Sequence, residues 1–238
     1  MNISVVLPAF NEEENIAIAI ESIHRYLQKR FSKFEIVVVN DGSYDETSRI
    51  VKNLAKSKKN IVLVNHKVNR GYGAALRSGF NKANHDLIFY TDSDNQYNIK
   101  DLDKLLPLIK NYDIVAGYRL NRQDPLMRIF IGYVYNLFIT LLFNLGIKDI
   151  DCSFKLYKKE ALDKIRLKSS SIFIDAEVLI KARKADFKVA QVGVNHFPRT
   201  QGKTSFEIGN RGRIFAFVKP QTAIDIFKEM KLLWSELK

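Results

Sequence analysis

The first half of the chain alternates short β-branched runs with amphipathic stretches, and this alternation restricts the fold more than any other feature. The runs that read as buried strands lie at residues 3–7, 35–40, 61–65, 86–91 and 113–116. Between the first two runs, Ile16, Ile20, Ile23 and Leu27 share one helical face. Further helices are predicted at about 45–55, 74–83 and 102–109. Alternating strands and helices are typical of β-α-β units, so we expect an α/β fold with a mainly parallel sheet flanked by helices.

The second half begins after Arg119 with a long apolar stretch. A mixed segment at 154–157, a helix at about 176–185 and a strand at 189–194 follow, and the tail reads as basic and irregular. No repeat or Gly/Ser linker interrupts the chain. The 238 residues are therefore expected to form a single domain, residues 1–238.

The distribution of charge narrows the kind of partner. Of the net charge of +12, +10 lies in residues 119–238, which carry 22 basic and 12 acidic side chains. Such a bias favours phosphates, nucleic acid or an anionic membrane surface. The single cysteine, Cys152, excludes an internal disulfide and no zinc pattern is present, so we expect a reducing, cytoplasmic setting. The N-terminus predicts no signal peptide.

The most informative local feature is a pair of aspartates, Asp92 and Asp94, directly after the apolar strand at 86–91. Strand periodicity places both carboxylates on one side, where they repel each other. A hard divalent cation such as Mg²⁺ or Mn²⁺ relieves that repulsion and keeps positions open for substrate phosphates. The alternative is a polar turn after a strand. The carboxyl end of an inner strand favours the metal site.

Polar groups follow other strands at the same edge. Asp41 comes after the second strand, as a candidate hydrogen-bond acceptor for a base or sugar, and the segment 8–12 follows the first. The segment 69–73, with Gly71, offers flexible backbone for the approach of a nucleotide or phosphate. Leu76 stands where a dinucleotide fingerprint needs glycine, and no P-loop motif occurs, so NAD-binding proteins and P-loop NTPases are disfavoured.

Taken together, the motifs resemble those of the inverting family 2 glycosyltransferases of GT-A fold. The matching segments are Val6-Leu7-Pro8-Ala9-Phe10-Asn11-Glu12, Val39-Asn40-Asp41-Gly42-Ser43, Asn69-Arg70-Gly71-Tyr72-Gly73 and Asp92-Ser93-Asp94-Asn95-Gln96. The polyprenyl-phosphate branch, which includes dolichol-phosphate mannose and glucose synthases, is the most similar. That likeness rests on Ala116-Gly117-Tyr118-Arg119, Asp151-Cys152-Ser153-Phe154-Lys155-Leu156-Tyr157 and Arg199-Thr200-Gln201-Gly202-Lys203-Thr204-Ser205. The chain departs from the branch at Ser153, usually glycine, and at Thr204-Ser205, usually serine-lysine. Unlike many relatives, it is expected to lack a C-terminal membrane anchor.

The resemblance implies roles for particular residues. Residues 1–118 would form the half that binds a nucleotide-sugar, and residues 119–238 the half that binds the acceptor. The base and ribose would be held by Pro8, Phe10, Glu12 and Asp41. Asp92 and Asp94 would bind the nucleotide and the metal, Mg²⁺ or Mn²⁺, with Gln96 beside them. Arg119, Arg128 and Arg199 are candidates to bind an acceptor phosphate, because guanidinium matches phosphate oxygens in a bidentate fork.

The apolar stretch at about 129–147 has no charged residue in 19 positions, long enough for a membrane-spanning helix. A single crossing, however, would separate Asp151 and Arg199 from Asp92 and Asp94. As a helix the stretch has two apolar faces, and a soluble protein buries only one of them. We therefore expect the second face to meet a lipid tail, a bilayer surface or another subunit, with the protein peripheral at the cytoplasmic membrane face.

Two readings of the reaction follow. The leading hypothesis is metal-dependent transfer of a hexose from a nucleotide-sugar to a polyprenyl phosphate. The alternative is transfer to a hydroxyl of a glycan or glycolipid, which needs a base, whereas a phosphate is already ionised. Asp151 is the best candidate base or acceptor-orienting carboxylate, and Asp175 is second. A nucleic-acid-binding module is disfavoured, because the aspartate pair repels a polyanion and no RNA-binding signature is present. The sequence leaves open the sugar, the nucleotide, the lipid length and the oligomeric state.

Overall fold

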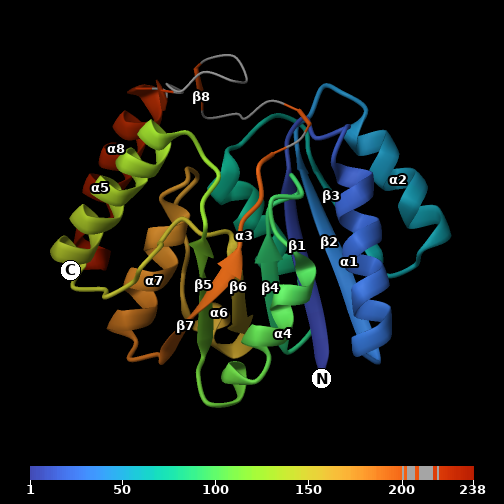
Figure 1. The fold of residues 1–238 in the computed structure, drawn as a ribbon, viewed down its shortest axis with the longest axis horizontal. Helices are drawn as coiled ribbons and strands as arrows, with labels where there is room; N and C mark the ends of the chain where they lie inside the picture. The colour runs from blue at the N-terminus through green and yellow to red at the C-terminus, as the bar shows by residue number, and fades with distance from the viewer. Residues whose placement is uncertain (200, 203–206, 209–216, 219) are drawn as a thin grey trace.

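The centre of the molecule is a seven-stranded sheet (Figure 1), seen in a computed structural model that describes residues 1–199, 201–202, 207–208, 217–218 and 220–238. The strand order is β3-β2-β1-β4-β6-β5-β7. The strands span β1 Asn2–Ala9, β2 Lys33–Asp41, β3 Ile61–His66, β4 Leu87–Thr91, β5 Ile114–Leu120, β6 Phe154–Lys158 and β7 Val189–Asn195. All neighbours pair in parallel except β6, which runs antiparallel to both β4 and β5. The expected α/β fold and each of the predicted strands are confirmed.

Helices cover both faces of the sheet (Figure 1). Alternate residues of β1 point to opposite faces, as strand geometry requires: Val5 joins the core under α1 (Ile16–Arg30), and Val6 joins the core under α3 (Tyr72–Lys82). The first core also includes α2 (Thr47–Ser57) and α4 (Leu102–Leu105), and the second includes α6 (Lys159–Lys164) and α7 (Ile174–Lys184). Burial on both faces explains the continuous apolar runs of β1, β2 and β4.

A third core lies beside the sheet and joins three helices. The helices α5 (Leu126–Phe143) and α8 (Pro220–Leu237) pack with α7 around Ile139, Ile180 and Leu233. Figure 1 shows α5 and α8 side by side at one end of the molecule. This core holds the second half of the chain together without extending the sheet.

Three sequence expectations need correction or adjustment. The tail was expected to be irregular, but residues 220–237 form α8, which begins at a proline and buries Met230, Leu233 and Leu237 at helical spacing. The single helix expected at 102–109 is wrong: α4 ends at Leu105, and a short 3₁₀ helix (Leu108–Lys110) follows Pro107, which lacks the N–H needed to continue an α-helix. The apolar helix expected at 129–147 ends at Phe143, because Asn144 adopts a left-handed conformation (φ 51°).

The reversed strand β6 sets up the functional site. Because β6 runs against its neighbours, its first residues lie where β4 and β5 end, with Thr91 opposite Phe154. Asp151, Cys152 and Ser153, which precede β6, therefore reach the same edge of the sheet as Asp92 and Asp94, which follow β4. The reversed direction of β6 thus brings residues from both halves of the chain to one edge of the sheet.

Candidate functional site

A cavity of about 960 Å³ opens at the carboxyl edge of the parallel strands. Its wall contains every residue that the sequence assigned to the site: Pro8, Phe10, Glu12, Asp41, Gly71, Asp92, Asp94, Gln96, Arg119, Arg128, Asp151 and Arg199. Asp175 also lines it, and so do apolar residues of α5 and α8. The cavity lies at the crevice beyond the strand ends, where α/β sheets bind ligands.

Asp92 is held by two hydroxyl groups. Tyr72 donates its hydroxyl to one carboxylate oxygen (2.9 Å), and Ser153 donates to the other (2.6 Å). Burial, followed by repulsion from Asp94, raises the pKa of Asp92 to about 6, against the two hydrogen bonds, which lower it. Ser153, which departs from the glycine usual in the branch, thus adds a hydrogen-bond donor to Asp92.

Asp94 belongs to a second group that ties residues from distant parts of the chain together. Arg199 donates Nη2 to both oxygens of Glu12 (2.8 and 2.7 Å), and its Nη1 lies 3.6 Å from Asp94. Burial raises the pKa of both Glu12 and Asp94, and the charge of Arg199 opposes that rise. Four residues of the motif that begins at Arg199 lie outside the described residues: Thr200, Lys203, Thr204 and Ser205.

Asp41 holds the loop at 69–73 in place. Its two oxygens accept the backbone N–H of Arg70 (3.0 Å) and of Gly71 (2.9 Å), and His66 contacts it at 2.5 Å. Gly71 has a φ of 94°, and a Cβ there would lie 2.4 Å from the carbonyl oxygen of Ser170, so only glycine fits. Asp41 therefore shapes the loop beside the cavity as well as lining it.

The residues expected to hold a cation fit a hard divalent ion with open coordination positions. Asp92 and Asp94 are adjacent carboxylates whose pKa values are raised by burial, and an added positive charge would reverse that rise. The side-chain nitrogen of Gln96 donates to the carbonyl of Phe197 (3.1 Å), which leaves its amide oxygen for another partner. Among the described residues no group of three His, Cys, Asp or Glu side chains has metal-binding geometry. Two carboxylates and an amide suit Mg²⁺ or Mn²⁺ completed by substrate oxygens.

The other two expected arginines, Arg119 and Arg128, lie in a second network of ion pairs in the cavity wall. Arg119 places its fork, Nε and Nη2, on Asp149 (2.7 and 2.6 Å). Asp124 lies between Arg122 and Arg128, at 3.0 and 3.2 Å. The sequence motifs indicate neither the acidic partners, Asp149 and Asp124, nor the presence of Arg122 in the cavity wall. The spacing of three arginines within residues 119–128 is the signal that would have found Arg122.

The two candidate bases have different surroundings. Asp175 is 5% exposed in its side chain and contacts the fully buried Lys155 (2.6 Å) and the hydroxyl of Tyr90 (2.5 Å), which makes it an ion-pair partner. One oxygen of Asp151 is buried and has no hydrogen-bond partner among the described residues. Burial and then repulsion from Asp175 raise the pKa of Asp151 to about 7. Asp151 is therefore the carboxylate able to interact with a bound molecule.

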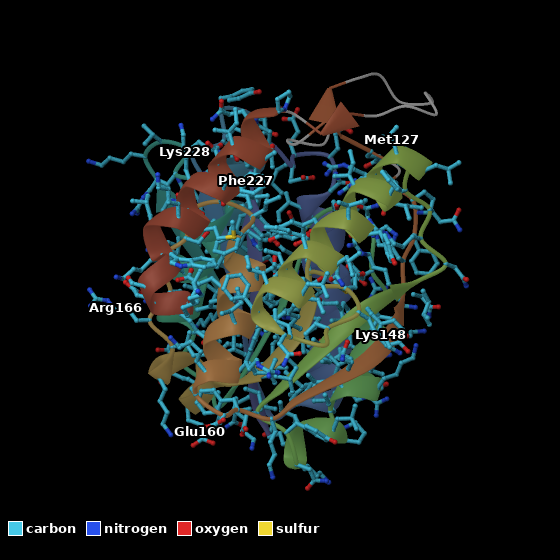
Figure 2. All side chains as sticks on the ribbon, turned by 90° about the vertical axis from the view of Figure 1, so that its left-hand side faces the viewer. Met127, Lys148, Glu160, Arg166, Phe227 and Lys228 are labelled. Carbon is cyan, nitrogen blue, oxygen red and sulfur yellow. The ribbon has the colours of Figure 1, made fainter. Side chains whose placement is uncertain are left out.

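The cavity extends to α5 and α8, where its wall is apolar, and we call this part the apolar channel. Phe130, Val134 and Phe138 of α5 line it from one side, and Ile226 and Phe227 of α8 from the other. Figure 2 looks onto these two helices and shows Phe227 on the side of α8 turned toward α5; its ring centre lies 6.0 Å from that of Phe138. By length and composition α5 is long and apolar enough to cross a membrane, and only 6% of it is buried.

Comparison with known proteins identifies the family. The model of the glycosyl transferase family 2 matches residues 4–166, which carry the strand-end motifs and Asp151. The chain belongs to glycosyltransferase family 2. This confirms the resemblance drawn from the sequence motifs.

Relatives of this family 2 protein have names from the polyprenyl-phosphate branch. A dolichyl-phosphate beta-glucosyltransferase of Trichomonas vaginalis is 34% identical over 209 residues, covering 81% of this chain and 64% of the relative. An undecaprenyl-phosphate 4-deoxy-4-formamido-L-arabinose transferase of Photorhabdus laumondii is 29% identical over 208 residues, covering 86% and 62%. The chain thus spans slightly less than two thirds of the length of these relatives.

Solved structures support the GT-A fold of this family 2 protein. Glucosyl-3-phosphoglycerate synthase from Mycobacterium tuberculosis, crystallised with Mn²⁺, UDP and glucosyl-3-phosphoglycerate, superposes with a TM-score of 0.67. The two proteins are 22% identical, and the match covers 85% of this chain and 73% of the synthase. The expected GT-A fold is confirmed.

Proposed function

We propose that this protein transfers a hexose from a nucleotide-sugar to a polyprenyl phosphate. The observation that carries the proposal is the cavity, whose wall combines the Asp92/Asp94 pair, several arginines and the apolar residues of α5 and α8. A substrate with a charged head and a long apolar tail matches this combination of surfaces. The names of the relatives from Trichomonas vaginalis and Photorhabdus laumondii support the same acceptor class.

The donor half is proposed to bind the nucleotide-sugar at the strand ends. Pro8, Phe10 and Asp41 lie where the base and ribose would bind, and Gly71 presents backbone close to the same place. Asp92, Asp94 and Gln96 would hold Mg²⁺ or Mn²⁺, which, when bound, would neutralise charge on the departing nucleoside diphosphate. Tyr72 and Ser153 keep the carboxylate of Asp92 oriented toward the cavity.

The acceptor half is proposed to orient a phosphate nucleophile. A phosphate monoester has a second pKa near 6, so it attacks without losing a proton to the protein. Arg128 and Arg199 line the cavity close to the carboxylates, whereas the fork of Arg119 is already bound to Asp149. Arg119 therefore reaches a phosphate only through its remaining nitrogen and mainly fixes the wall of the site.

The same geometry supports peripheral attachment at an anionic membrane surface. Leu126, Tyr133 and Leu141 of α5 are each more than 60% exposed, which is unusual for apolar residues so close together on one helix. Helix α5 also lines the cavity that contains Asp92. If α5 lies in the bilayer interface and does not cross the membrane, a soluble nucleotide-sugar can still reach this cavity. Basic residues nearby, such as Lys148, favour anionic lipids.

One observation favours a second function. The unpartnered oxygen of Asp151 and its pKa of about 7 suit a general base, which a hydroxyl acceptor requires and a phosphate does not. Transfer to a hydroxyl of a glycan or glycolipid is therefore the alternative.

One experiment separates the two functions. The protein is incubated with Mn²⁺ or Mg²⁺ and a panel of UDP- and GDP-sugars, and nucleotide release is measured with a polyprenyl phosphate, the matched polyprenol and simple sugars. We expect nucleotide release with the polyprenyl phosphate and not with the polyprenol or the sugars. The Asp151→Asn variant should retain measurable transfer to the polyprenyl phosphate. The other outcome is nucleotide release with polyprenol or sugars that Asp151→Asn reduces on the order of 100-fold or more. That outcome would establish a hydroxyl acceptor.

A further inference from the structure

One carboxylate of α8 has no role in the proposed chemistry yet, among the described residues, accepts more hydrogen bonds than Asp92, Asp94 or Asp151. Glu229 accepts from the hydroxyls of Ser169 (2.5 Å), Ser170 (2.7 Å) and Ser171 (2.6 Å). It also accepts from the backbone N–H of Ser170 (2.9 Å) and of Ser171 (3.2 and 3.4 Å). Partial burial alone raises the pKa of Glu229, but these hydrogen bonds outweigh it and bring the pKa below its ordinary value. The carboxylate is thus ionised and saturated by one short segment.

The opposite side of that serine segment contacts the loop beside the donor site. The carbonyl oxygen of Ser170 accepts the backbone N–H of Gly73 (2.9 Å). A Cβ on Gly73 would lie 2.6 Å from the carbonyl oxygen of Ser169 and 2.7 Å from that of Ser171. The backbones of the two segments are therefore packed as closely as glycine allows.

The loop in turn carries two contacts of the donor site. Gly71 donates its N–H to Asp41, and Tyr72 donates its hydroxyl to Asp92. Both residues line the cavity, while α8 lines the apolar channel with Ile226 and Phe227, the latter labelled in Figure 2. Ser169–Ser171 therefore lie between the helix of the acceptor channel and the loop of the donor site.

We propose that Glu229 is a positioning residue, which fixes the donor-side loop at residues 69–73 from the acceptor-side helix α8 through Ser169–Ser171. The proposal that this loop serves a nucleotide-sugar rests on the proposed function; the mechanical connection does not. Charge-assisted hydrogen bonds are roughly twice as strong as neutral ones, and a carboxylate accepts at both oxygens. Glutamine at this position keeps the shape but replaces one acceptor by an NH₂ group that faces donors.

Glu236 provides a matched control on the same helix. It also binds the body of the protein, through Lys168 and Lys181, the latter at 3.2 Å. Its contacts do not touch Ser169–Ser171. Glu236→Gln should therefore weaken these two ion pairs but leave the hydrogen bonds of Glu229 to Ser169–Ser171, and with them the segment at 69–73, unchanged.

The first measurement is amide hydrogen exchange in the intact protein, which requires no substrate. In Glu229→Gln we expect exchange at residues 69–75 to accelerate about tenfold, the equivalent of one lost charge-assisted hydrogen bond, with α1 unchanged. Ser170→Ala, a milder change that removes one hydroxyl donor, should give a smaller acceleration at the same residues. Unchanged exchange at 69–75 in both variants, or equal acceleration in Glu236→Gln, would overturn the proposal.

The second measurement is steady-state kinetics with the nucleotide-sugar found active in the panel. Glu229→Gln should raise the donor KM about fivefold to tenfold and leave the acceptor KM unchanged, whereas a general loss of stability would lower both rate and binding in proportion to the folded fraction. Equal changes in the two KM values would also overturn the proposal. If the wild-type protein turns over no nucleotide-sugar, the proposed function fails, and the exchange data alone still decide whether Glu229 positions the loop.

Discussion

The donor side and the acceptor side of the cavity are built in opposite ways. On the donor side, Asp41 and Asp92 follow buried strands, and each has its oxygens held by groups of the protein. On the acceptor side, only Ile139 of α5 is buried, and the hydroxyls of Tyr135 and Thr140 have no hydrogen-bond partner among the described residues. One side is fixed before any ligand arrives, while the other leaves much apolar surface exposed and holds two buried hydroxyls that have no partner among the described residues.

This difference indicates where binding free energy would arise. A fixed donor side loses little entropy on binding, so its contacts act on charge and orientation. The exposed apolar face of α5 gains from being covered, at about 25 cal/mol for each Å² removed from water.

The largest effect is expected from breaking the donor side. Asp92→Asn keeps the size of the side chain but removes an anionic ligand from the proposed cation site, so we expect turnover to fall on the order of 100-fold or more. Nucleotide release in the presence of Mn²⁺ measures it. Asp103→Asn, at a remote ion pair with Arg30, should leave turnover unchanged. Full activity of Asp92→Asn, or of the wild type in excess EDTA, would contradict the metal assignment.

The second prediction breaks only the acceptor side. Arg128→Lys retains the charge but loses the planar fork, so transfer to polyprenyl phosphate should fall about tenfold or more while nucleotide-sugar affinity stays the same. Initial rates and equilibrium binding of the nucleotide-sugar test the two halves separately. Arg30→Lys is the control. An equal loss of donor affinity would mean that Arg128 acts on the nucleotide.

The third prediction concerns the outer surface of α5. Leu141 is 74% exposed, and Leu141→Asp should weaken binding to anionic liposomes about tenfold, because a buried leucine contributes about 1.5–3 kcal/mol. Ile18→Asp, at an exposed apolar residue of α1, is the matched control and should bind as the wild type does. Binding should also weaken with salt. Identical losses in both variants would argue against a membrane-facing α5.

The smallest effect is a change in stability at Asp151. Burial and repulsion from Asp175 raise its pKa from 3.8 to about 7, so between these values the folded state binds more protons than the unfolded state. Stability contributed by the neutral carboxyl is full below about pH 4 and is lost as the pH rises through 7. Asp151→Asn cannot ionise, so its Tm should equal that of the wild type near pH 4 and exceed it by on the order of 10 °C at pH 8. Thermal denaturation across this range measures the difference, and a constant offset would refute the assignment.

Much of the donor side could be predicted from the sequence. Contiguous apolar runs set the strands, and parallel strands bring their carboxyl ends together, so Asp41 and Asp92 had to approach one another. Asp151 was included only through the resemblance to a family. Its place depends on the direction of β6, which the sequence pattern of residues 154–157 does not specify.

The acceptor side was harder to predict, for two physical reasons. Helix α8 buries only a narrow stripe, Met230, Leu233 and Leu237, and its basic residues resemble those of an irregular tail. The ion pair of Arg119 with Asp149 depends on tertiary packing, and arginine alone does not reveal such a partner. Arg128 and Asp124, in contrast, are four residues apart, so their pairing was open to prediction from the sequence. The sequence thus predicted which arginines reach the cavity, but not that each of them is already paired with a carboxylate.

The antiparallel strand β6 has a consequence for how such chains can diversify. The chain leaves the sheet at the end of β5, forms α5, and returns in β6, which is hydrogen-bonded to β5 itself. The excursion thus begins and ends on adjacent strands, where the entropy of closing a loop depends only weakly on its length. Residues 121–150 are in this sense a cassette: a helix of different length or polarity fits between the same two strands, and the nucleotide-sugar end of the sheet keeps its register.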